Sequence, residues 1–253
     1  MSENKQTEDL KPQGPAKKEK KPAPPFFSYE NFKSLAILFL IVFVIRSVVA
    51  SPYKVPTPSM EPTIKVGDRL LANKLAYNLK VPFTNIPIIT WSSPKRGDII
   101  VFKYPGDESI DYVKRIVAVA GDTVEVKENV LFINGKEQTK VDHNHDRAIL
   151  EDIKDYKEVR NLFIENLGGL DHWVMTSKDE GRTSFYDNWG PQTVPEDTVF
   201  VMGDNRDNSQ DSRVFRAVPI KNVRGKALVV IWSRNTNDSF PYLRLNRFGH
   251  WLY

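Results

Sequence analysis

The chain has 253 residues, a formal net charge of +4 and a hydrophobic fraction of 40%. This length can hold one large domain or two small ones, each with a hydrophobic core. The mild positive charge does not indicate a nucleic-acid surface, which requires clustered basic residues with aromatic residues among them. The sequence contains no cysteine, which excludes disulfides, thiolate metal sites and a cysteine nucleophile.

Residues 1–31 are rich in lysine, proline and glutamate and contain almost no apolar residue before Phe26. Such a segment cannot bury enough apolar surface to fold, so we expect a disordered tail. Lysines between positions 17 and 21 precede the apolar segment that follows. By the positive-inside rule they place this tail in the cytoplasm.

Residues 32–51 contain the apolar run SLAILFLIVFVIRSVVA, from Ser34 to Ala50, with Arg46 as its single charge. A helix of this length spans about 25 Å, close to the short limit for a membrane span. We therefore expect a transmembrane anchor over 32–51, with the following residues outside the cytoplasm. A cleavable signal peptide is an alternative, although the segment before the run is long for one. A buried core helix is another, although the run has no polar face before Arg46.

The chain after the anchor is predicted to be mainly β-structure. Five segments are short, rich in valine, isoleucine and phenylalanine, and separated by glycine, proline, asparagine or aspartate. They are Arg96–Tyr104, Tyr112–Gly121, Asp122–Gln138, Asp197–Asp204 and Gly225–Ser233. The Asn134-Gly135 pair predicts a two-residue type I′ turn between strands.

Residues 141–190 differ from the rest of this region because they are polar and contain three of the four histidines. The segment DIKDYKEVRNLFIENL (152–167) has the spacing of a helix. The Gly168-Gly169 pair that follows favours a β-hairpin at least as strongly. We expect an inserted β-rich subdomain over 141–190, so that 52–140 and 191–253 together form the β core.

A proline-rich stretch, KVPTPSMEPTI (Lys54–Ile64), surrounds Ser59. It is consistent with a semi-rigid linker in which the serine has no chemical role. Proline also fixes φ and restricts the residue before it, so the stretch can hold a serine hydroxyl and its backbone N–H in one orientation.

A serine nucleophile needs a base, and no histidine is well placed in the sequence. His143, His145 and His172 lie in the polar insertion and His250 follows much later, so we expect all four on the surface. A lysine can act as base when burial lowers its pKa toward neutrality. Lys114, at the start of an apolar strand, is the candidate, although a lysine there is more often solvated.

The segment MGDNRDNSQDSR (Met202–Arg213) concentrates acidic, amide and arginine side chains directly after an apolar strand. It lacks the glycine and glutamate that an EF-hand loop requires at its sixth and twelfth positions. We therefore expect pairs of aspartate and arginine within the segment instead of a calcium site. The sequence predicts no metal and no other cofactor.

Five motifs together resemble the bacterial type I signal peptidase (leader peptidase) family. In chain order they are PTPSMEPT, GDRLLANKLAY, RGDIIVF, YVKRIVAVAGD and MGDNRDNSQDSR, all between Phe32 and Ser233. The resemblance implies an all-β catalytic ectodomain of antiparallel sheets, with a barrel-like core and an inserted β region, behind one N-terminal transmembrane helix. It also implies a serine endopeptidase that uses a serine/lysine dyad to remove signal peptides from exported preproteins.

The resemblance also implies roles for single residues. Ser59 matches the nucleophile, Lys114 the general base and Met60 a residue that faces the substrate. Residues that match the oxyanion site or its support are Thr57, Arg115, Asp204, Ser209, Asp211 and Arg213. Among these, Ser209 is expected to orient the lysine amine, and Thr57 stands where the family often has a serine that helps to bind the oxyanion.

The implied partners are preproteins with signal peptides, the lipid bilayer and the export machinery, without nucleic acid. The implied location is the inner (cytoplasmic) membrane, crossed once, with the catalytic domain on the outer side. Two other functions fit parts of the pattern. A self-cleaving repressor-type protease has a related dyad but is soluble, and an anchored β-domain could bind partners without catalysis.

Overall fold

The computed structural model describes residues 28–81, 84–153, 160–177, 187–235 and 242–253. Of the disordered tail predicted for 1–31, residues 1–27 lie outside these described residues, and the first helix begins at Tyr29. The chain divides into two compact units, Met1–Val42 and Phe43–Tyr253.

The first helix, α1 (Tyr29–Val44), continues as one π-helical turn, η1 (Ile45–Val49). Together, Asn31–Val49 are long and apolar enough to cross a membrane. Large apolar side chains of this helix are exposed, for example Phe32 at 72% and Phe39 at 66%. None of the apolar segment is buried, so the alternative of a buried core helix is wrong.

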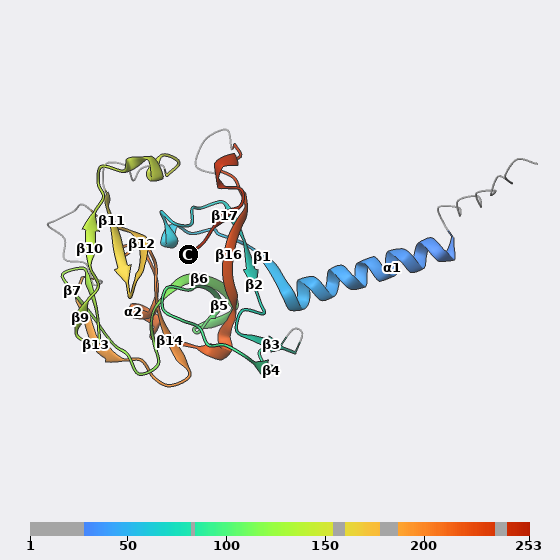
Figure 1. The fold of residues 1–253 in the computed structure, drawn as a ribbon, viewed down its shortest axis with the longest axis horizontal. Helices are drawn as coiled ribbons and strands as arrows, with labels where there is room; N and C mark the ends of the chain where they lie inside the picture. The colour runs from blue at the N-terminus through green and yellow to red at the C-terminus, as the bar shows by residue number, and fades with distance from the viewer. Residues whose placement is uncertain (1–27, 82–83, 154–159, 178–186, 236–241) are drawn as a thin grey trace, which may run out of the picture. The chain divides into compact units, whose positions relative to one another are not determined.

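The larger unit is built on an antiparallel sheet of eight strands (Figure 1). Along the sheet these are β1 (Ala50–Lys54), β2 (Asp68–Asn73), β16 (Val223–Ser233), β5 (Ile99–Tyr104), β6 (Asp107–Val119), β14 (Thr198–Met202) and β15 (Val218–Pro219), while β17 (His250–Trp251) also pairs with β16. Within the described residues β1 and β15 do not pair with each other, so the sheet is open. The antiparallel β-architecture is confirmed, but the predicted barrel-like core is not a closed barrel.

Three smaller sheets complete the unit. They are β10 (Lys140–Asp142), β11 (Arg160–Leu167) and β12 (Leu170–Ser177); β13 (Trp189–Thr193), β7 (Thr123–Lys127), β8 (Val130–Ile133) and β9 (Lys136–Glu137); and β3 (Asn78–Lys80) with β4 (Pro87–Thr90). Short helices connect the strands: η2 (Pro58–Met60), η3 (Arg147–Leu150), α2 (Ser212–Phe215), η4 (Ile220–Asn222) and η5 (Leu245–Arg247).

The structure contains both turns predicted from the Asn134-Gly135 and Gly168-Gly169 pairs. Asn134 and Gly135 have φ values of 52° and 73° between β8 and β9, as a type I′ turn requires. Gly168 and Gly169 join β11 to β12, which confirms the hairpin and shows that the helical alternative is wrong from Arg160 onward. The boundaries of the predicted insertion stay a prediction.

Strand β6 carries the two basic residues of the YVKRIVAVAG motif into the core. Lys114 lies opposite Ile100 and Arg115 opposite Ile99 on strand β5. Successive side chains of a strand point to opposite faces, so these two residues enter different parts of the interior. The sheet therefore positions both residues from one segment.

Candidate active site

Ser59 lies in the helical turn η2, which follows strand β1. Pro58 occupies the start of this turn, where a missing N–H costs nothing. The first N–H groups of a helix have no partner within it, and the Ser59 N–H donates no hydrogen bond to any described residue. The Ser59 side chain is only 7% exposed, and Met60 beside it is buried in the core. The hydroxyl and the backbone N–H of one residue are thus both held in place.

The amine of Lys114 lies against this hydroxyl. Lys114 Nζ donates hydrogen bonds to Ser59 Oγ at 2.6 Å and to the carbonyl oxygen of Val113 at 3.0 Å. Lys114 is 3% exposed, and burial lowers its pKa to about 8, while the more distant Asp211 and Asp204 act in the opposite direction. A substantial fraction of the amine is therefore neutral in weakly alkaline solution.

The pair opens onto a cleft of about 340 Å³. Apolar and polar side chains line it on both sides, among them Val55, Met60, Ile110, Tyr112 and Asn208. Thr57 Oγ1 lies 3.4 Å from Ser59 Oγ at the same cleft. A peptide carbonyl entering the cleft can therefore meet two hydroxyls, one amine and the Ser59 N–H, which has no partner among the described residues.

Asp204 and Arg115 form a buried ion pair next to Lys114. Arg115 donates from Nε to Asp204 Oδ1 at 2.9 Å and from Nη2 to Oδ2 at 2.8 Å. Thr63 Oγ1 donates to the same carboxylate at 2.6 Å. Burial alone raises the pKa of Asp204, but the Arg115 guanidinium outweighs it and holds that pKa below its ordinary value. The pair ties strand β6 to the loop after β14 and to the segment that follows Ser59.

Asp211 and Arg213 form a second buried pair. Arg213 donates to the Asp211 carboxylate from Nε at 2.9 Å and from Nη2 at 2.8 Å. The Gly203 N–H also donates to Asp211, at 3.1 Å. This pair confirms the predicted aspartate–arginine contacts within Met202–Arg213. Two other charged residues of the segment pair with residues outside it: Asp204 pairs with Arg115, and Arg206 pairs with Glu165.

The hydroxyl of Ser209 is buried close to Asp211, but it makes no hydrogen bond of normal geometry with any described residue. Lys114 donates to Ser59 and Val113 instead. The predicted orientation of the amine by Ser209 therefore stays a prediction.

Two residues not singled out from the sequence, Asn205 and Gly203, lie against the main chain of Ser59. Asn205 donates from its backbone N–H to the Ser59 carbonyl oxygen and from Nδ2 to the Pro58 carbonyl oxygen, both at 3.2 Å. A Cβ on Gly203 would lie 2.3 Å from the same Ser59 oxygen and 2.3 Å from Ser209 Oγ. Both residues belong to the MGDNRDNSQDSR motif, which could be recognised from the sequence. Their contact with Ser59, 144 to 146 positions earlier, could not be predicted from it.

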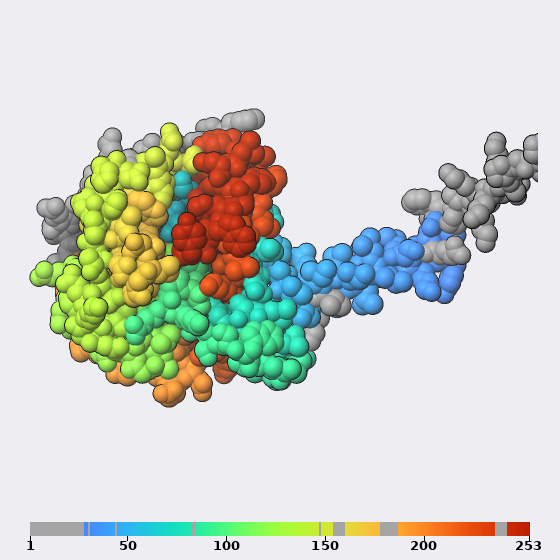
Figure 2. Space-filling view, in the orientation of Figure 1, coloured from blue at the N-terminus to red at the C-terminus, as the bar shows by residue number. Residues whose placement is uncertain are grey.

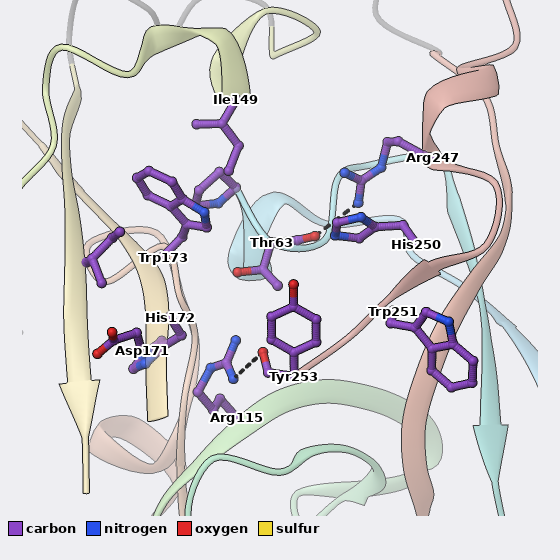
Figure 3. A pocket seen from close by; sticks show the side chains of 12 residues that line it. Thr63, Arg115, Ile149, Asp171, His172, Trp173, Arg247, His250, Trp251 and Tyr253 are labelled. Carbon is purple, nitrogen blue, oxygen red and sulfur yellow. Dashed lines mark hydrogen bonds between the residues drawn. The ribbon is translucent and has the colours of Figure 1, made fainter. Parts of the chain in front are cut away.

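The histidines do not join the dyad, and one lies where it was not expected. No histidine hydrogen-bonds to Ser59 or Lys114 among the described residues. His172 is 4% exposed, so its predicted surface position is wrong. It lies on strand β12 beside Glu165 and lines a separate pocket with Trp173, as Figure 3 shows. Hairpin β11–β12 borders the C-terminal segment across this hollow (Figure 2).

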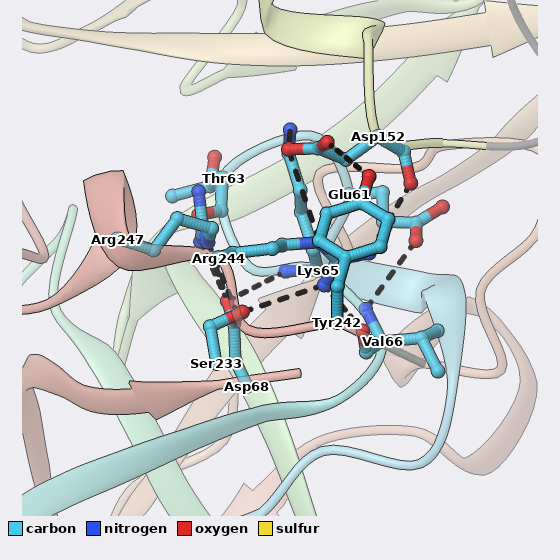
Figure 4. A network of polar contacts seen from close by, with 10 residues as sticks. All are labelled: Glu61, Thr63, Lys65, Val66, Asp68, Asp152, Ser233, Tyr242, Arg244 and Arg247. Carbon is cyan, nitrogen blue, oxygen red and sulfur yellow. Dashed lines mark hydrogen bonds and ion pairs between the residues drawn. The ribbon is translucent and has the colours of Figure 1, made fainter. Parts of the chain in front are cut away.

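Residues behind Ser59 are tied to the C-terminal segment by a buried polar network (Figure 4). Asp68 accepts hydrogen bonds from Arg247 Nε at 3.0 Å and from Ser233 Oγ at 2.6 Å. Arg247 also donates to the Thr63 carbonyl oxygen at 3.0 Å, and Lys65 Nζ lies 3.5 Å from Asp152. In the part of the chain that the structure describes, no group of three acidic, histidine or cysteine side chains is placed to hold a metal.

Comparison with known proteins relates most of the chain to one family. Residues 28–232 match the family described as signal peptidase, peptidase S26. Signal peptidase I of Aquifex aeolicus is 38% identical over 233 residues, which cover 82% of this chain and 85% of the relative. Signal peptidase I of Pseudomonas aeruginosa is 35% identical over 212 residues, which cover 79% and 71%. A crystal structure of a signal peptidase I from Enterococcus faecalis aligns with 54% of this chain and 98% of its own, at 28% identity and a TM-score of 0.33.

Proposed function

We propose that this chain, which belongs to the signal peptidase family (peptidase S26), is a membrane-anchored serine endopeptidase. It cleaves N-terminal signal peptides from exported preproteins. The observation that carries the proposal is the hydrogen bond of 2.6 Å between Lys114 Nζ and Ser59 Oγ at the wall of a cleft. A hydroxyl and a buried amine at this distance are a nucleophile and its base.

Cleavage begins with the neutral form of Lys114. Its amine takes the proton of the Ser59 hydroxyl while Oγ attacks the scissile carbonyl carbon. The resulting ammonium then gives this proton to the nitrogen of the leaving chain, which departs as a free amine. A water molecule, deprotonated by the same amine, attacks the acyl carbon, and the ammonium returns this proton to Ser59 Oγ as the signal peptide leaves with a new carboxylate.

The negative charge on the substrate carbonyl oxygen needs donors that are in place beforehand. The Ser59 N–H, which has no other partner among the described residues, is one such donor. The Thr57 hydroxyl, 3.4 Å from Ser59 Oγ, is the other. Met60 faces the substrate from the same wall of the cleft.

The buried ion pairs support this arrangement without touching the substrate. Arg115 with Asp204 fixes the strand position next to Lys114, and Asp211 with Arg213 fixes the loop that holds the Ser59 carbonyl oxygen. Ser209 lies in the same loop and helps to orient the Lys114 amine.

The enzyme crosses the inner membrane once through α1, with its tail in the cytoplasm and the β-unit outside. The apolar segment Asn31–Val49 and the lysines before it support this topology. Substrates are tethered to the same membrane by their own apolar signal segments and are delivered by the export machinery. Cleavage follows small residues, typically alanine at the first and third positions before the cut, because a shallow pocket loses binding when overpacked.

Incubation of the purified full chain with a signal-bearing preprotein tests the proposal. Mass spectrometry should find one new N-terminus directly after the small residues, and Ser59→Ala should produce none. A preprotein with phenylalanine at the position before the cut should resist cleavage. Equal cleavage by Ser59→Ala, or of the phenylalanine substrate, would contradict the proposed site.

A further inference from the structure

A third, smaller pocket lies at the end of the apolar segment, away from the Ser59 cleft. Its volume is about 80 Å³, and Ser47 and Val48 of η1 form part of its wall. Three cationic side chains line it as well, Lys74, Lys80 and Arg224, and we call these three residues the basic pocket. Since Ser47 and Val48 belong to the segment long enough to span a membrane, the basic pocket lies where that segment ends.

The positive charge of the basic pocket is only partly balanced. Lys74 Nζ donates to the Ser47 carbonyl oxygen at 2.6 Å, and Lys80 Nζ donates to the Val223 carbonyl oxygen at 2.6 Å. Carbonyl groups carry no net charge, and neither lysine forms an ion pair with any described carboxylate. Arg224 has one, Asp111, with 3.6 Å between Nε and Oδ1. Three cations therefore share one carboxylate.

The protonation of Lys80 reflects this imbalance. Burial, together with the neighbouring charges of Arg224, Lys103 and Lys74, lowers the pKa of Lys80 to about 8. An anion bound among these groups would remove the repulsion and restore the charge of Lys80. The arrangement thus favours a compact anionic ligand.

An exposed apolar surface adjoins the basic pocket. Strands β3 and β4 pair only with each other in the described sheets, and the loop residues Thr84 and Asn85 between them line the pocket. The apolar residues on and beside β4 are Ile86, Ile88, Ile89 and Trp91, between 52% and 64% exposed, and we call them the apolar hairpin. A two-stranded ribbon with such a surface is marginal in water. Trp91 donates its indole N–H to the Leu75 carbonyl oxygen at 3.0 Å, so its ring is exposed while its polar atom is satisfied, which suits a membrane interface.

We infer that the basic pocket binds the phosphate of an anionic phospholipid while the apolar hairpin lies in the interface of the same bilayer. The cations of the basic pocket lie beside the apolar hairpin at the end of the apolar segment. In one leaflet of a bilayer, the phosphate groups likewise lie beside the apolar acyl chains. The inference rests on the proposed membrane anchor and does not depend on the proposed cleavage reaction.

The lack of cysteine in the chain permits a direct test. The full chain carrying Ile88→Cys, labelled with an environment-sensitive fluorophore, is placed in phosphatidylcholine nanodiscs with increasing fractions of phosphatidylglycerol. We expect the emission to shift to shorter wavelength as phosphatidylglycerol increases, because the hairpin enters the interface. Lys80→Gln should need about fivefold more phosphatidylglycerol for the same shift, the effect of one lysine at an anionic surface.

The matched control is Lys136→Gln, the same change at an exposed position of strand β9, which should leave the response unchanged. Lys74→Gln should act like Lys80→Gln, and thermal unfolding of each variant shows whether it is folded. The inference is overturned if the label stays in water in every disc, or if Lys136→Gln weakens the response as much as Lys80→Gln. It is also overturned if inorganic phosphate, added to phosphatidylcholine discs, reproduces the shift. Because the experiment measures lipid contact and not cleavage, a negative result would contradict the lipid-binding inference without bearing on the proposed cleavage reaction.

Discussion

Two lysines are almost equally buried in this protein, and their surroundings differ. Lys114 at the cleft is 3% exposed and Lys65 in the network of Figure 4 is 4% exposed. Lys65 lies 3.5 Å from the Asp152 carboxylate, whereas Lys114 contacts a serine hydroxyl and a carbonyl oxygen. Burial lowers the pKa of both lysines, but only Lys65 has a carboxylate in contact that opposes the shift.

The difference separates the proposed base, Lys114, from a structural cation. Burial alone removes water from an amine, and a contacting carboxylate then restores the advantage of the charged form. The two carboxylates that act on the pKa of Lys114, Asp211 and Asp204, are each paired with an arginine. The amine is left to share its hydrogen bond with the hydroxyl that it would deprotonate.

The largest expected effect is on the reaction at Lys114. Lys114→Met should lower the cleavage rate about 10³-fold or more, because no group remains to take the serine proton. Lys65→Met, the matched change in the network, should stay within a few-fold of the original rate. The measurement is initial rate on a preprotein at equal concentrations of folded enzyme. Retained activity of Lys114→Met together with loss in His172→Gln would replace the dyad by a histidine base.

A substitution in the network of Figure 4 should lower the free energy of unfolding, whereas a substitution at the cleft should lower the cleavage rate. Arg247→Met leaves the buried Asp68 without its arginine and should cost about 3–5 kcal/mol of unfolding free energy. Urea denaturation measures this loss, and the activity per folded molecule should change little. Arg69→Met, which removes an exposed arginine nearby, should change stability by less than about 0.5 kcal/mol. Equal losses from both variants would show that the ion pair has no special role.

Lys114 should also oppose the stability of the fold. Because its pKa is lowered from an ordinary 10.5 to about 8, the unfolded chain binds this proton more tightly than the folded one. Stability therefore rises with pH between about 8 and 10.5, and below that window the full cost is present. Lys114→Met should thus raise the unfolding free energy at pH 7 by up to about 3 kcal/mol and bring no gain above pH 10.5. An equal gain at both pH values would indicate better packing instead.

The smallest expected effect is the dependence of the rate on pH. The active amine is neutral, so the rate should rise about tenfold per pH unit below the pKa of Lys114 and level off above it. The limb should therefore bend near pH 8, where burial places this pKa. Rates from pH 6 to 10 on one substrate measure it, and a bend near 6.5 would point to a histidine.

Local patterns predicted the strands and turns well because their causes are local. Alternating apolar residues and the Asn134-Gly135 and Gly168-Gly169 pairs act over a few positions. The open edge of the main sheet depends on whether β1 meets β15, which no short segment encodes.

The candidate site was predictable to a similar degree. Ser59 and Lys114 stand in motifs that resemble a known family, and the structure brings them together. The partners of Asp204 and Arg206 lie outside their motif. The sequence favoured pairs within the motif because it contains aspartates and arginines only a few positions apart. The burial of His172 depends on what packs over β12, so a polar sequence around it gave the wrong answer.

The spacing of these contacts along the chain has a consequence for synthesis. Ser59 and Lys114 are 55 positions apart, Arg115 and Asp204 are 89 apart, and Thr63 and Asp204 are 141 apart. Contacts between distant positions form late, because loop closure must precede them. A nascent chain that already carries Ser59 and Lys114 still lacks Asn205 to hold the Ser59 carbonyl. Ser59 is therefore held in its folded position only after the chain up to Asn205 has been made.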